Sequence, residues 1–322
     1  EKTKAGVSLA DFNGNGKDDI IVGTDDDNIY VIYDDGTVAP GFPYTTGDKI
    51  RSAPSVANID SEKVIFTGSY YSDLYAINSD GSLLFTIPTG GKVHSPSFLD
   101  HNGKTYIFFG STDDMIYAVD SDGNALAGWP VDISDVLSKS VVFSDLNDDE
   151  IPEIIALTYG AKIIVFNIDG TYYDGFPISM HTAFISSPLV IDIDGDSNLE
   201  ILGSAVNSLD VIDIKSIGQN TEFWNMYRGN ERRTGYHSSL LGCTDDTACN
   251  YNPDAMTDDG SCAFLDDCGV CNGGNVDDLG CGCFEASPSG CDETCGSELE
   301  YDECGVCGGP GPNVLCLDES LV

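Results

Sequence analysis

The chain has 322 residues, of which 54 are Asp or Glu and 14 are Lys or Arg, so its formal net charge at pH 7 is −40. Nucleic acid and anionic membrane surfaces repel so negative a chain, which excludes both as expected partners. The same charge suits divalent cations and a salty medium, in which repulsion is screened within about 10 Å.

Five consecutive segments repeat one order of short apolar runs and turns, starting with the run after Ser8. Four of them contain an Asp-Gly turn, ending at Gly36, Gly81, Gly123 and Gly170, and these turns are 45, 42 and 47 residues apart. Hairpin signals with about four strands per ~40–45 residues, and no helical periodicity, are typical of propeller blades. The sequence therefore predicts an all-β chain with at least five four-stranded blades.

Three acidic loops each precede an apolar strand, at residues 11–19, 145–153 and 192–200. Oxygen-bearing side chains fall at positions 1, 3, 5 and 9, which is how a short loop wraps Ca²⁺, and position 7 offers its backbone carbonyl. The predicted ligands are Asp11, Asn13, Asn15, Lys17 and Asp19; Asp145, Asn147, Asp149, Ile151 and Glu153; and Asp192, Asp194, Asp196, Asn198 and Glu200. The alternative is an Asx-rich hairpin without metal, because Asp and Asn bond their own backbone. Recurrence in three repeats favours Ca²⁺, in a structural role.

Two of the five units depart from this loop pattern. The loops at residues 58–63 and 100–104 are shorter and lack the full set of oxygen ligands, so we expect no metal there. The second acidic loop has Glu150 at position 6, where a glycine is expected, which puts its backbone geometry in question.

Dipeptides at the entry to successive inner strands occupy one repeat position. They are Arg51-Ser52, His94-Ser95, Ser138-Lys139 and Ile185-Ser186. We expect them to ring the mouth of the central channel of the propeller. A ligand-contacting rim is favoured over a catalytic pair at His94 and Ser95, because the repeat explains why these two residues are adjacent.

Gly-aromatic-Pro turns place Phe42, Trp129 and Phe176 at equivalent points of three units. We interpret these aromatic residues as packing anchors between blades rather than as platforms for sugars. The segment 223–236 is predicted to form the last outer strand and to close the ring. Its three arginines, Arg228, Arg232 and Arg233, are expected to pair with acidic neighbours, in preference to forming an anion site.

The repeated pattern carries a family resemblance. Ser-Ser-Pro, an Asp-rich loop, Glu-Ile followed by Gly-Ser, and Asp-Gly before Gly-Trp-Pro recur over residues 5–236. This pattern resembles the FG-GAP/VCBS propellers, which are similar to the integrin α-subunit headpiece, and the segment 223–236 resembles the ends of such propellers. The resemblance implies a propeller over residues 1–236 whose blades carry calcium loops. Five blades is a lower bound, because the first unit begins almost at residue 1, and we expect a ring of six to eight with its start outside this sequence.

All 12 cysteines lie between Cys243 and Cys316. An even number of cysteines in a short acidic segment indicates a disulfide framework in an oxidising compartment, and the pairing is not derivable from the sequence. Zinc knuckles built from the two Cys-Gly-Val-Cys motifs are the alternative. We therefore expect a loop-dominated, disulfide-rich module at residues 237–322, which resembles the Cys-rich modules of secreted bacterial surface proteins.

The leading functional hypothesis is a secreted or cell-surface calcium-binding propeller that mediates adhesion to, or recognition of, an extracellular glycan or protein. The sequence contains no 18-residue apolar run, so we expect no membrane insertion. A spacer module within a longer surface protein or filament is one alternative. A polysaccharide-active or quinone-dependent propeller enzyme is the other, and it is disfavoured because no paired catalytic carboxylates stand outside the acidic loops.

Overall fold

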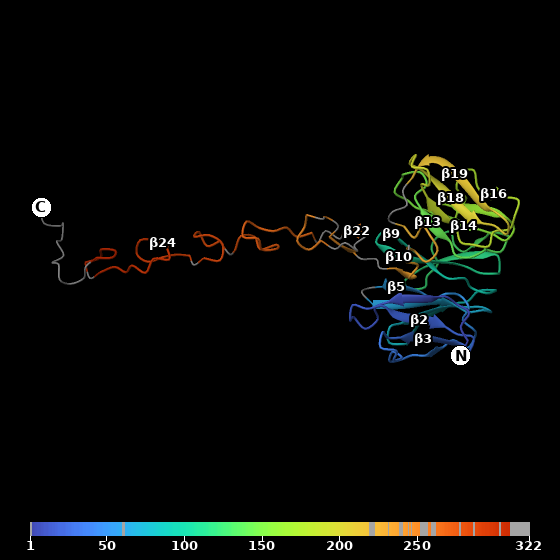
Figure 1. The fold of residues 1–322 in the computed structure, drawn as a ribbon, viewed down its shortest axis with the longest axis horizontal. Helices are drawn as coiled ribbons and strands as arrows, with labels where there is room; N and C mark the ends of the chain where they lie inside the picture. Colours follow the sequence, from blue (N-terminus) through green and yellow to red (C-terminus); the bar gives the residue numbers. More distant parts are fainter. Residues whose placement is uncertain are drawn as a thin grey trace. The chain divides into compact units, whose positions relative to one another are not determined.

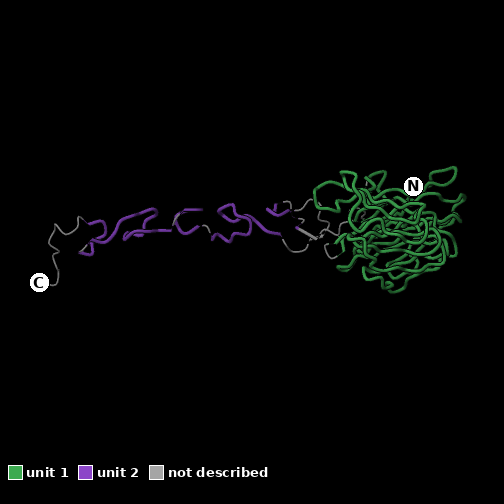
Figure 2. Tube along the Cα trace, turned by 90° about the horizontal axis from the view of Figure 1, so that it is seen from below, with its two compact units in different colours: residues 1–239 green, residues 240–322 purple. Residues whose placement is uncertain are grey.

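The computed structural model describes residues 2–59, 62–218, 223–230, 232–237, 241–243, 245, 247–251, 257–258, 262–276, 278–285, 287–302 and 304–309. The chain divides into two compact units, residues 1–239 and 240–322 (Figure 2). No helix of the described residues is long and apolar enough to cross a membrane.

Unit 1 is a β-propeller, and its blades are antiparallel sheets whose strands follow one another in chain order (Figure 1). Blade 1 is β1 (Val7–Ala10), β2 (Asp19–Gly23), β3 (Asn28–Ile32) and β4 (Tyr44–Thr45). Blade 2 is β5 (Ser55–Ile59), β6 (Glu62–Gly68), β7 (Leu74–Asn78) and β8 (Leu83–Ile87). Blade 3 is β9 (Ser97–His101), β10 (Lys104–Gly110), β11 (Met115–Asp120) and β12 (Val131–Asp132).

Blades 4 and 5 complete the described part of the propeller. Blade 4 is β13 (Val142–Ser144), β14 (Glu153–Leu157), β15 (Lys162–Phe166) and β16 (Ile178–Ser179). Blade 5 has three strands, β17 (Leu189–Ile191), β18 (Asn198–Ser204) and β19 (Leu209–Ile217). The predicted all-β propeller is confirmed. The fifth blade differs from the prediction by lacking a fourth strand among the described residues.

The core lies between successive blades, because alternate side chains of each strand face one neighbouring sheet. Phe66 of blade 2 meets Phe98 of blade 3 edge to face, with ring centroids 5.4 Å apart. Phe108 of blade 3 meets Phe143 of blade 4 in the same way at 5.0 Å. All four rings are fully buried, and such pairs add about 0.5–1.5 kcal/mol beyond the area they bury.

Serine hydroxyls join the first strands of neighbouring blades. Ser55 donates through Oγ to the Pro96 carbonyl at 2.8 Å, and Ser97 donates to the Val141 carbonyl at 2.7 Å. Ser8 makes the corresponding bond to the Pro54 carbonyl. These buried bonds fix the rotation between successive blades, which explains why serine recurs at the entry to the inner strands.

Trp129 anchors blade 3 to blade 4, as predicted. It is 6% exposed, its Nε1 donates to the Ile168 carbonyl at 2.9 Å, and its ring meets Phe166 at a centroid distance of 5.6 Å. The equivalent aromatic residues are also core residues: Phe42 is buried and Phe176 packs against the core between blades 4 and 5.

We expect Trp129→Phe to lower the free energy of unfolding by about 1–3 kcal/mol, because it leaves the Ile168 carbonyl unpaired at a packed interface. Urea unfolding followed by circular dichroism measures this change. Phe176→Leu serves as the control, since Phe176 is only partly buried and its ring has no N–H donor, so this change removes apolar packing without leaving a carbonyl unpaired. A Trp129→Phe protein as stable as the wild type would contradict the anchoring role.

The segment 223–237 is not an outer strand, so that prediction was wrong. Its carbonyls instead accept hydrogen bonds from inner-strand amides at the centre of the propeller. The pairs are Phe143 N to Trp224 O at 3.0 Å, Val190 N to Asn225 O at 3.1 Å, Leu9 N to Thr234 O at 3.0 Å and Val56 N to Gly235 O at 2.8 Å. At its end β20 (Tyr236–His237) pairs with β5 in parallel. The physical reason is that these strand edges carry buried amides, which need an acceptor.

Blades 1 and 5 lie at opposite ends of unit 1 in Figure 1, and no core cluster of the described residues joins them. Each presents an outer sheet face with exposed apolar side chains. Val7 and Ile20 lie on that face of blade 1, whereas Leu209 and Val211 lie on that of blade 5. Between internal blades the equivalent faces are covered. A ring of more than five blades stays a prediction, and these faces are where further blades would pack.

Unit 2 contains short strand pairs, β21 (Leu241–Gly242) with β22 (Thr257–Asp258) and β23 (Pro288–Ser289) with β24 (Thr294–Cys295). Five disulfides interleave along it: Cys243–Cys262, Cys249–Cys271, Cys268–Cys283, Cys281–Cys295 and Cys291–Cys307. The predicted disulfide framework is confirmed. The zinc alternative is wrong for this structure, because no described cysteine is a free thiol.

Unit 2 needs these covalent links because the described apolar side chains of residues 240–309 form no core cluster. Val276, Phe284 and Tyr301 are all more than 60% exposed. Each bridge closes a loop spanning 14–22 residues, for which chain entropy predicts a stabilisation of about 3 kcal/mol.

Candidate functional site

The three acidic loops share one backbone frame. In each, the amide of position 6 donates to the carboxylate of position 1, at 2.8 Å from Gly16 to Asp11, 2.8 Å from Glu150 to Asp145 and 3.0 Å from Ser197 to Asp192. Position 6 has a positive φ in all three loops, +80° at Gly16, +66° at Glu150 and +71° at Ser197. Glu150 therefore adopts the same positive φ as Gly16, so the second loop keeps its backbone geometry without a glycine at position 6.

Position 9 closes each loop in the same way. Its carboxylate accepts the amide of position 2, at 2.8 Å from Phe12 to Asp19, 2.7 Å from Leu146 to Glu153 and 2.8 Å from Ile193 to Glu200. All three carboxylates are buried. A buried carboxylate held by one amide has further oxygen lone pairs available for a cation.

The third loop has the geometry of a cation site. Asp192, Asp194 and Glu200 each offer a carboxylate oxygen, and these oxygens all lie within 4.8 Å of one another. Glu200 is 3% exposed, and its Oε1 is buried without a hydrogen-bond partner in the described part of the chain. Because an unpaired buried carboxylate oxygen is costly, this donor set fits a hard cation such as Ca²⁺.

The second loop also concentrates negative charge. Burial, together with the negative charges of Asp149 and Asp145, raises the pKa of Glu153 to about 7. A divalent cation among these three carboxylates would reverse that effect, since a nearby positive charge favours the ionised form.

The first loop is closed mainly by its own backbone. Asp11 accepts the amides of Gly14, Asn15 and Gly16, and although burial acts to raise its pKa, these bonds lower it overall. Asp19 accepts a second amide, from Asp34, at 2.9 Å. These contacts are the ones expected of an Asx-rich hairpin without metal. Of the three loops, the first therefore has its carboxylates best satisfied by backbone amides alone.

The side chain of Lys17 points away from the first loop and forms an ion pair with Asp34 at 2.7 Å, which leaves its carbonyl as the predicted ligand. In the shortened loop of blade 3, the carboxylate of Asp100 bonds to His237 at 3.0 Å and Thr105 at 2.6 Å. The predicted shortened loop of blade 2 includes Asp60 and Ser61, which lie outside the described residues.

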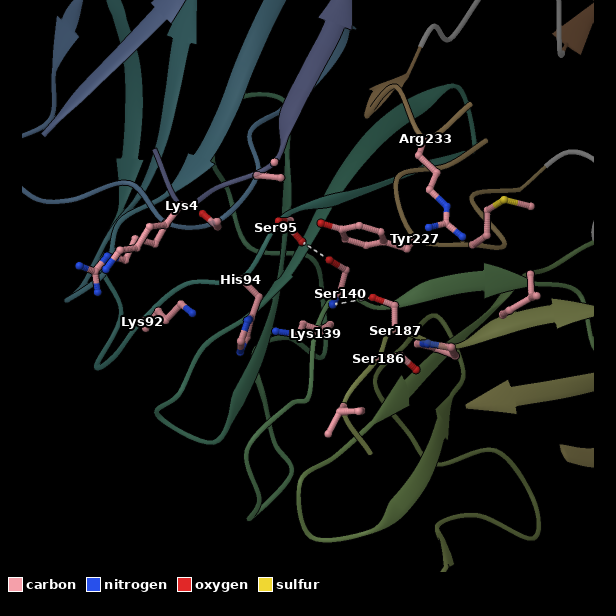
Figure 3. Close-up of a pocket in the computed structure, with 18 residues that line it drawn as sticks. Lys4, Lys92, His94, Ser95, Lys139, Ser140, Ser186, Ser187, Tyr227 and Arg233 are labelled. Atoms are coloured by element: carbon pink, nitrogen blue, oxygen red, sulfur yellow. Dashed lines mark hydrogen bonds between the residues drawn. The ribbon is translucent and has the colours of Figure 1, made fainter. Parts of the chain in front are cut away.

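All the repeat-position residues except Ser138 line one cavity of about 510 Å³ at the centre of the propeller (Figure 3). The expectation was wrong for Ser138, which is fully buried and donates through Oγ to the Ser186 carbonyl at 2.6 Å. Loops of all five blades contribute, together with the segment 223–237. Sequence reasoning placed Arg51, Ser52, His94, Ser95, Lys139, Ile185 and Ser186 here. It missed Lys4, Lys92, Tyr227 and Arg233. The available signal for Lys92 was its position two residues before His94, which the sequence did place at the rim.

The cavity is positively charged in a strongly negative chain. Lys4, Arg51, Lys92, Lys139 and Arg233 line it, and none of its 18 lining residues is Asp or Glu. Asp25, just outside the lining, pairs with Arg51 at 2.6 Å and with Lys4 at 3.6 Å. Among the described residues, no ion pair involves Lys92, Lys139 or Arg233.

Residues 223–237 are called the closing segment below, because they bond to inner strands of blades 1, 2, 4 and 5. The three arginines of this segment have different roles. Arg228 is buried and donates to backbone carbonyls, so the expectation that it pairs with acids was wrong. Arg232 forms the expected pair, with Asp18 at 3.3 Å. Arg233 lines the central cavity.

His94 is buried in the cavity wall next to Lys92 and Lys139 (Figure 3). One ring nitrogen bonds to the Leu137 carbonyl, whereas Nε2 has no partner among the described residues. Burial, together with the positive charges of Lys92 and Lys139, lowers the pKa of His94 to about 4. The imidazole is therefore neutral at pH 7.

We expect His94 to make stability depend on pH. Because its pKa is about 4 when folded and about 6.5 when unfolded, the unfolded chain takes up a proton as the pH falls below 6.5. Stability is fully present above pH 6.5 and is lost towards pH 4, by about 2 kcal/mol at pH 5. Urea unfolding at pH 7 and pH 5 is compared between the wild type and His94→Gln. The carboxylates titrate in both proteins, so the difference between their losses of stability is the contribution of His94. Equal pH slopes in the two proteins would contradict it.

No protein-family model matches the chain, and no curated protein matches it. Solved structures similar to this chain include BBS1N in complex with ARL6DN (14% identity, 60% of each chain, TM-score 0.43). The computationally designed Ika8 protein is similar at 14% identity over 64% of this chain and 57% of its own (TM-score 0.47). BamB from Moraxella catarrhalis is similar at 11% identity over 66% of this chain and 62% of its own (TM-score 0.47). The chain thus spans less than two thirds of these structures, and the likeness concerns the fold alone.

Proposed function

We propose that the chain is an extracellular, calcium-binding propeller of the FG-GAP/VCBS type that recognises a glycan or protein ligand without catalysing a reaction on it. The observation that carries the calcium part is the unpaired, buried Oε1 of Glu200 beside Asp192 and Asp194. The other two acidic loops share the same backbone frame and supply oxygens at the same positions. In each, the ion ties an inner hairpin of a blade in place.

The central cavity supports recognition. Its volume of about 510 Å³ falls within the usual range of ligand pockets, about 300–1,000 Å³. Its walls come from five blades held rigidly by the serine bonds and the closing segment, so a ligand meets preformed geometry. Disulfides in unit 2 support an oxidising, extracellular environment.

Several features of the cavity favour binding over catalysis. His94 and Ser95 are adjacent in the sequence, yet Nε2 of His94 has no hydroxyl partner among the described residues, as a nucleophile and its base require. The cavity is also lined by no carboxylate that could act as a general acid or base. We therefore propose a non-enzymatic role.

Binding of the purified chain to a panel of polysaccharides and bacterial cells, in millimolar calcium and in chelator, tests this proposal. We expect binding to one class of ligand, weakened by chelator. Absence of binding in both conditions would refute recognition and favour a spacer role. Turnover of any polysaccharide, abolished by His94→Ala, would refute the non-enzymatic assignment.

The spacer role is the second candidate, because successive disulfides interleave along the described part of unit 2, where the apolar side chains form no core cluster. A spacer needs no ligand in the central cavity. Wild-type protein and cavity variants would then behave identically in every binding assay.

A further inference from the structure

We propose that the central cavity of unit 1 binds an anionic sugar, namely the carboxylated or sulfated unit of an acidic polysaccharide. This inference rests on the proposed recognition function and specifies its ligand. The cavity gathers five of the chain's 14 Lys and Arg residues, although the chain carries 54 acidic residues and none of them lines it.

The charge of the cavity is available to a ligand. Asp25 neutralises part of the charge of Lys4 and Arg51, whereas no ion pair with a described residue involves Lys92, Lys139 or Arg233. Lys92 and Lys139 lie together on one side of the cavity, and Arg233 lies on the other, beside Tyr227 (Figure 3). The positive groups thus face one space from two sides.

The lysines are held close together despite their mutual repulsion. Burial lowers the pKa of Lys92, and the charges of Lys139 and Arg51 lower it further. Lys92 and Arg51 both lie over the ring of Tyr70, at 5.7 and 4.5 Å from its centroid, and this contact offsets only part of the repulsion between the like charges. A bound anion relieves this repulsion and adds charge-assisted hydrogen bonds.

Serine hydroxyls add further donors. Ser186 accepts the Ser204 amide through Oγ at 2.9 Å, and Ser187 accepts the Ser140 amide through Oγ at 3.2 Å. Each hydroxyl still has its own hydrogen to donate, because an Oγ that accepts an amide does not use its O–H. Both residues line the cavity, so donors outnumber strong acceptors there.

Neutral donors beside the charges favour a sugar over a simple anion. Ser186 and Ser187 line the cavity with hydroxyls that can donate to the hydroxyl and ring oxygens of a sugar, while the lysines attract its negative group. Uronic acids and sulfated sugars carry both kinds of acceptor in one unit, whereas an acidic side chain offers only its carboxylate. Nε2 of His94 is buried from solvent, so His94 contributes to the cavity wall rather than a direct hydrogen bond.

The overall negative charge of the chain opposes an incoming anion, but mostly from a distance. At physiological ionic strength, interactions between exposed charges are largely screened beyond about 8 Å. Groups within the cavity act at shorter range and in a partly desolvated space, where their attraction is stronger. The local positive charge therefore decides what the cavity binds.

Calorimetric titration of the full chain, in constant calcium, tests the inference with four probes. Tri-galacturonate carries the carboxylate, its fully methyl-esterified form is the neutral counterpart, a carrageenan oligosaccharide carries sulfate, and poly-L-glutamate carries charge without sugar. We expect the wild type to bind one or both anionic sugars and neither the ester nor poly-L-glutamate. Tighter binding of tri-galacturonate would identify a carboxylated sugar as the ligand, and tighter binding of the carrageenan oligosaccharide a sulfated one.

Variants locate the binding site. We expect the double variant Lys92→Ala/Lys139→Ala to weaken binding of the anionic sugar by about 10–100-fold, and Arg233→Ala to weaken it by about tenfold. Lys49→Ala is the matched control, because Lys49 has the same charge and repeat position as Lys92 but lies outside the cavity. We expect it to bind within about threefold of the wild type. Unchanged thermal unfolding verifies that each variant is folded.

Several results would overturn the inference. The inference fails if the methyl ester binds as tightly as tri-galacturonate, or if poly-L-glutamate binds more tightly than the anionic sugars. It also fails if neither anionic sugar binds, or if the cavity variants bind with the affinity of the wild type. Binding of neutral polysaccharides or cells in these cases would leave the proposed recognition function standing. That function fails separately, when no polysaccharide and no cell binds the wild type.

Discussion

Replacing Arg228 by alanine is expected to lower the free energy of unfolding of unit 1 by about 3–5 kcal/mol. Arg228 is 5% exposed, and its guanidinium donates five hydrogen bonds. The acceptors are the carbonyls of Val7, Pro54, Arg233 and Thr234 and the Ser8 hydroxyl. They come from blade 1, the entry to blade 2 and the closing segment, so one side chain holds three parts of the chain together. Without it, several buried carbonyls lose their donor.

Urea unfolding followed by tryptophan fluorescence measures this loss, because the only two tryptophans of the chain, Trp129 and Trp224, lie in unit 1. Arg232→Ala is the control: its pair with Asp18 is exposed, and such pairs contribute at most about 1 kcal/mol. Arg228→Lys keeps the charge but supplies fewer donors in a different geometry, so we expect it to recover only part of the loss. An effect of Arg228→Ala no larger than that of Arg232→Ala would contradict the central position of Arg228.

The sequence predicts the blades well because their signals are local. Hairpin turns such as the one at Gly36, and alternation along strands such as β3, depend on residues close in the chain. The acidic loops are predictable for the same reason, since the bonds that set their backbone frame, from positions 6 and 2 to positions 1 and 9, all lie within nine residues. The backbone frame at Glu150 shows that hydrogen bonds to Asp145 can hold a positive φ where the sequence lacks glycine.

The segment 223–237 could not be placed from the sequence, because its partners are distant. Thr234 and Gly235 meet Leu9 and Val56, which are about two hundred residues away in the chain, and no local pattern encodes such pairings. For the same reason Arg228 and Arg233 look alike in the sequence, yet one is buried among carbonyls and the other lines the cavity. The charge of the cavity emerges only when five blades bring their entry loops together.

Removing calcium is expected to destabilise unit 1 by about 4–8 kcal/mol relative to protein in 10 mM calcium. Extracellular sites of this kind bind Ca²⁺ with a Kd of about 10⁻⁴–10⁻³ M. An ion that binds only the folded state then contributes about 1.4–2.7 kcal/mol per site at this concentration, and three acidic loops contribute independently. For a domain of this size, removing calcium therefore lowers Tm by at least about 8 °C.

Single-site variants measure how much each of the three loops contributes to the stabilisation by calcium. Glu200→Gln keeps the shape of the side chain but removes the charge that faces Asp192 and Asp194, so we expect it to abolish the share of the third loop, about a third of the calcium effect. Glu62→Gln is the control, because Glu62 is an exposed carboxylate next to the shortened loop of blade 2. Calorimetric unfolding in calcium and in chelator measures both. If Glu200→Gln responded to calcium as the wild type does, the third loop would not be a calcium site. If calcium did not change the unfolding temperature of the wild type, none of the three loops would be a calcium site. All three would then be Asx-rich hairpins held by their own backbone, like the first loop.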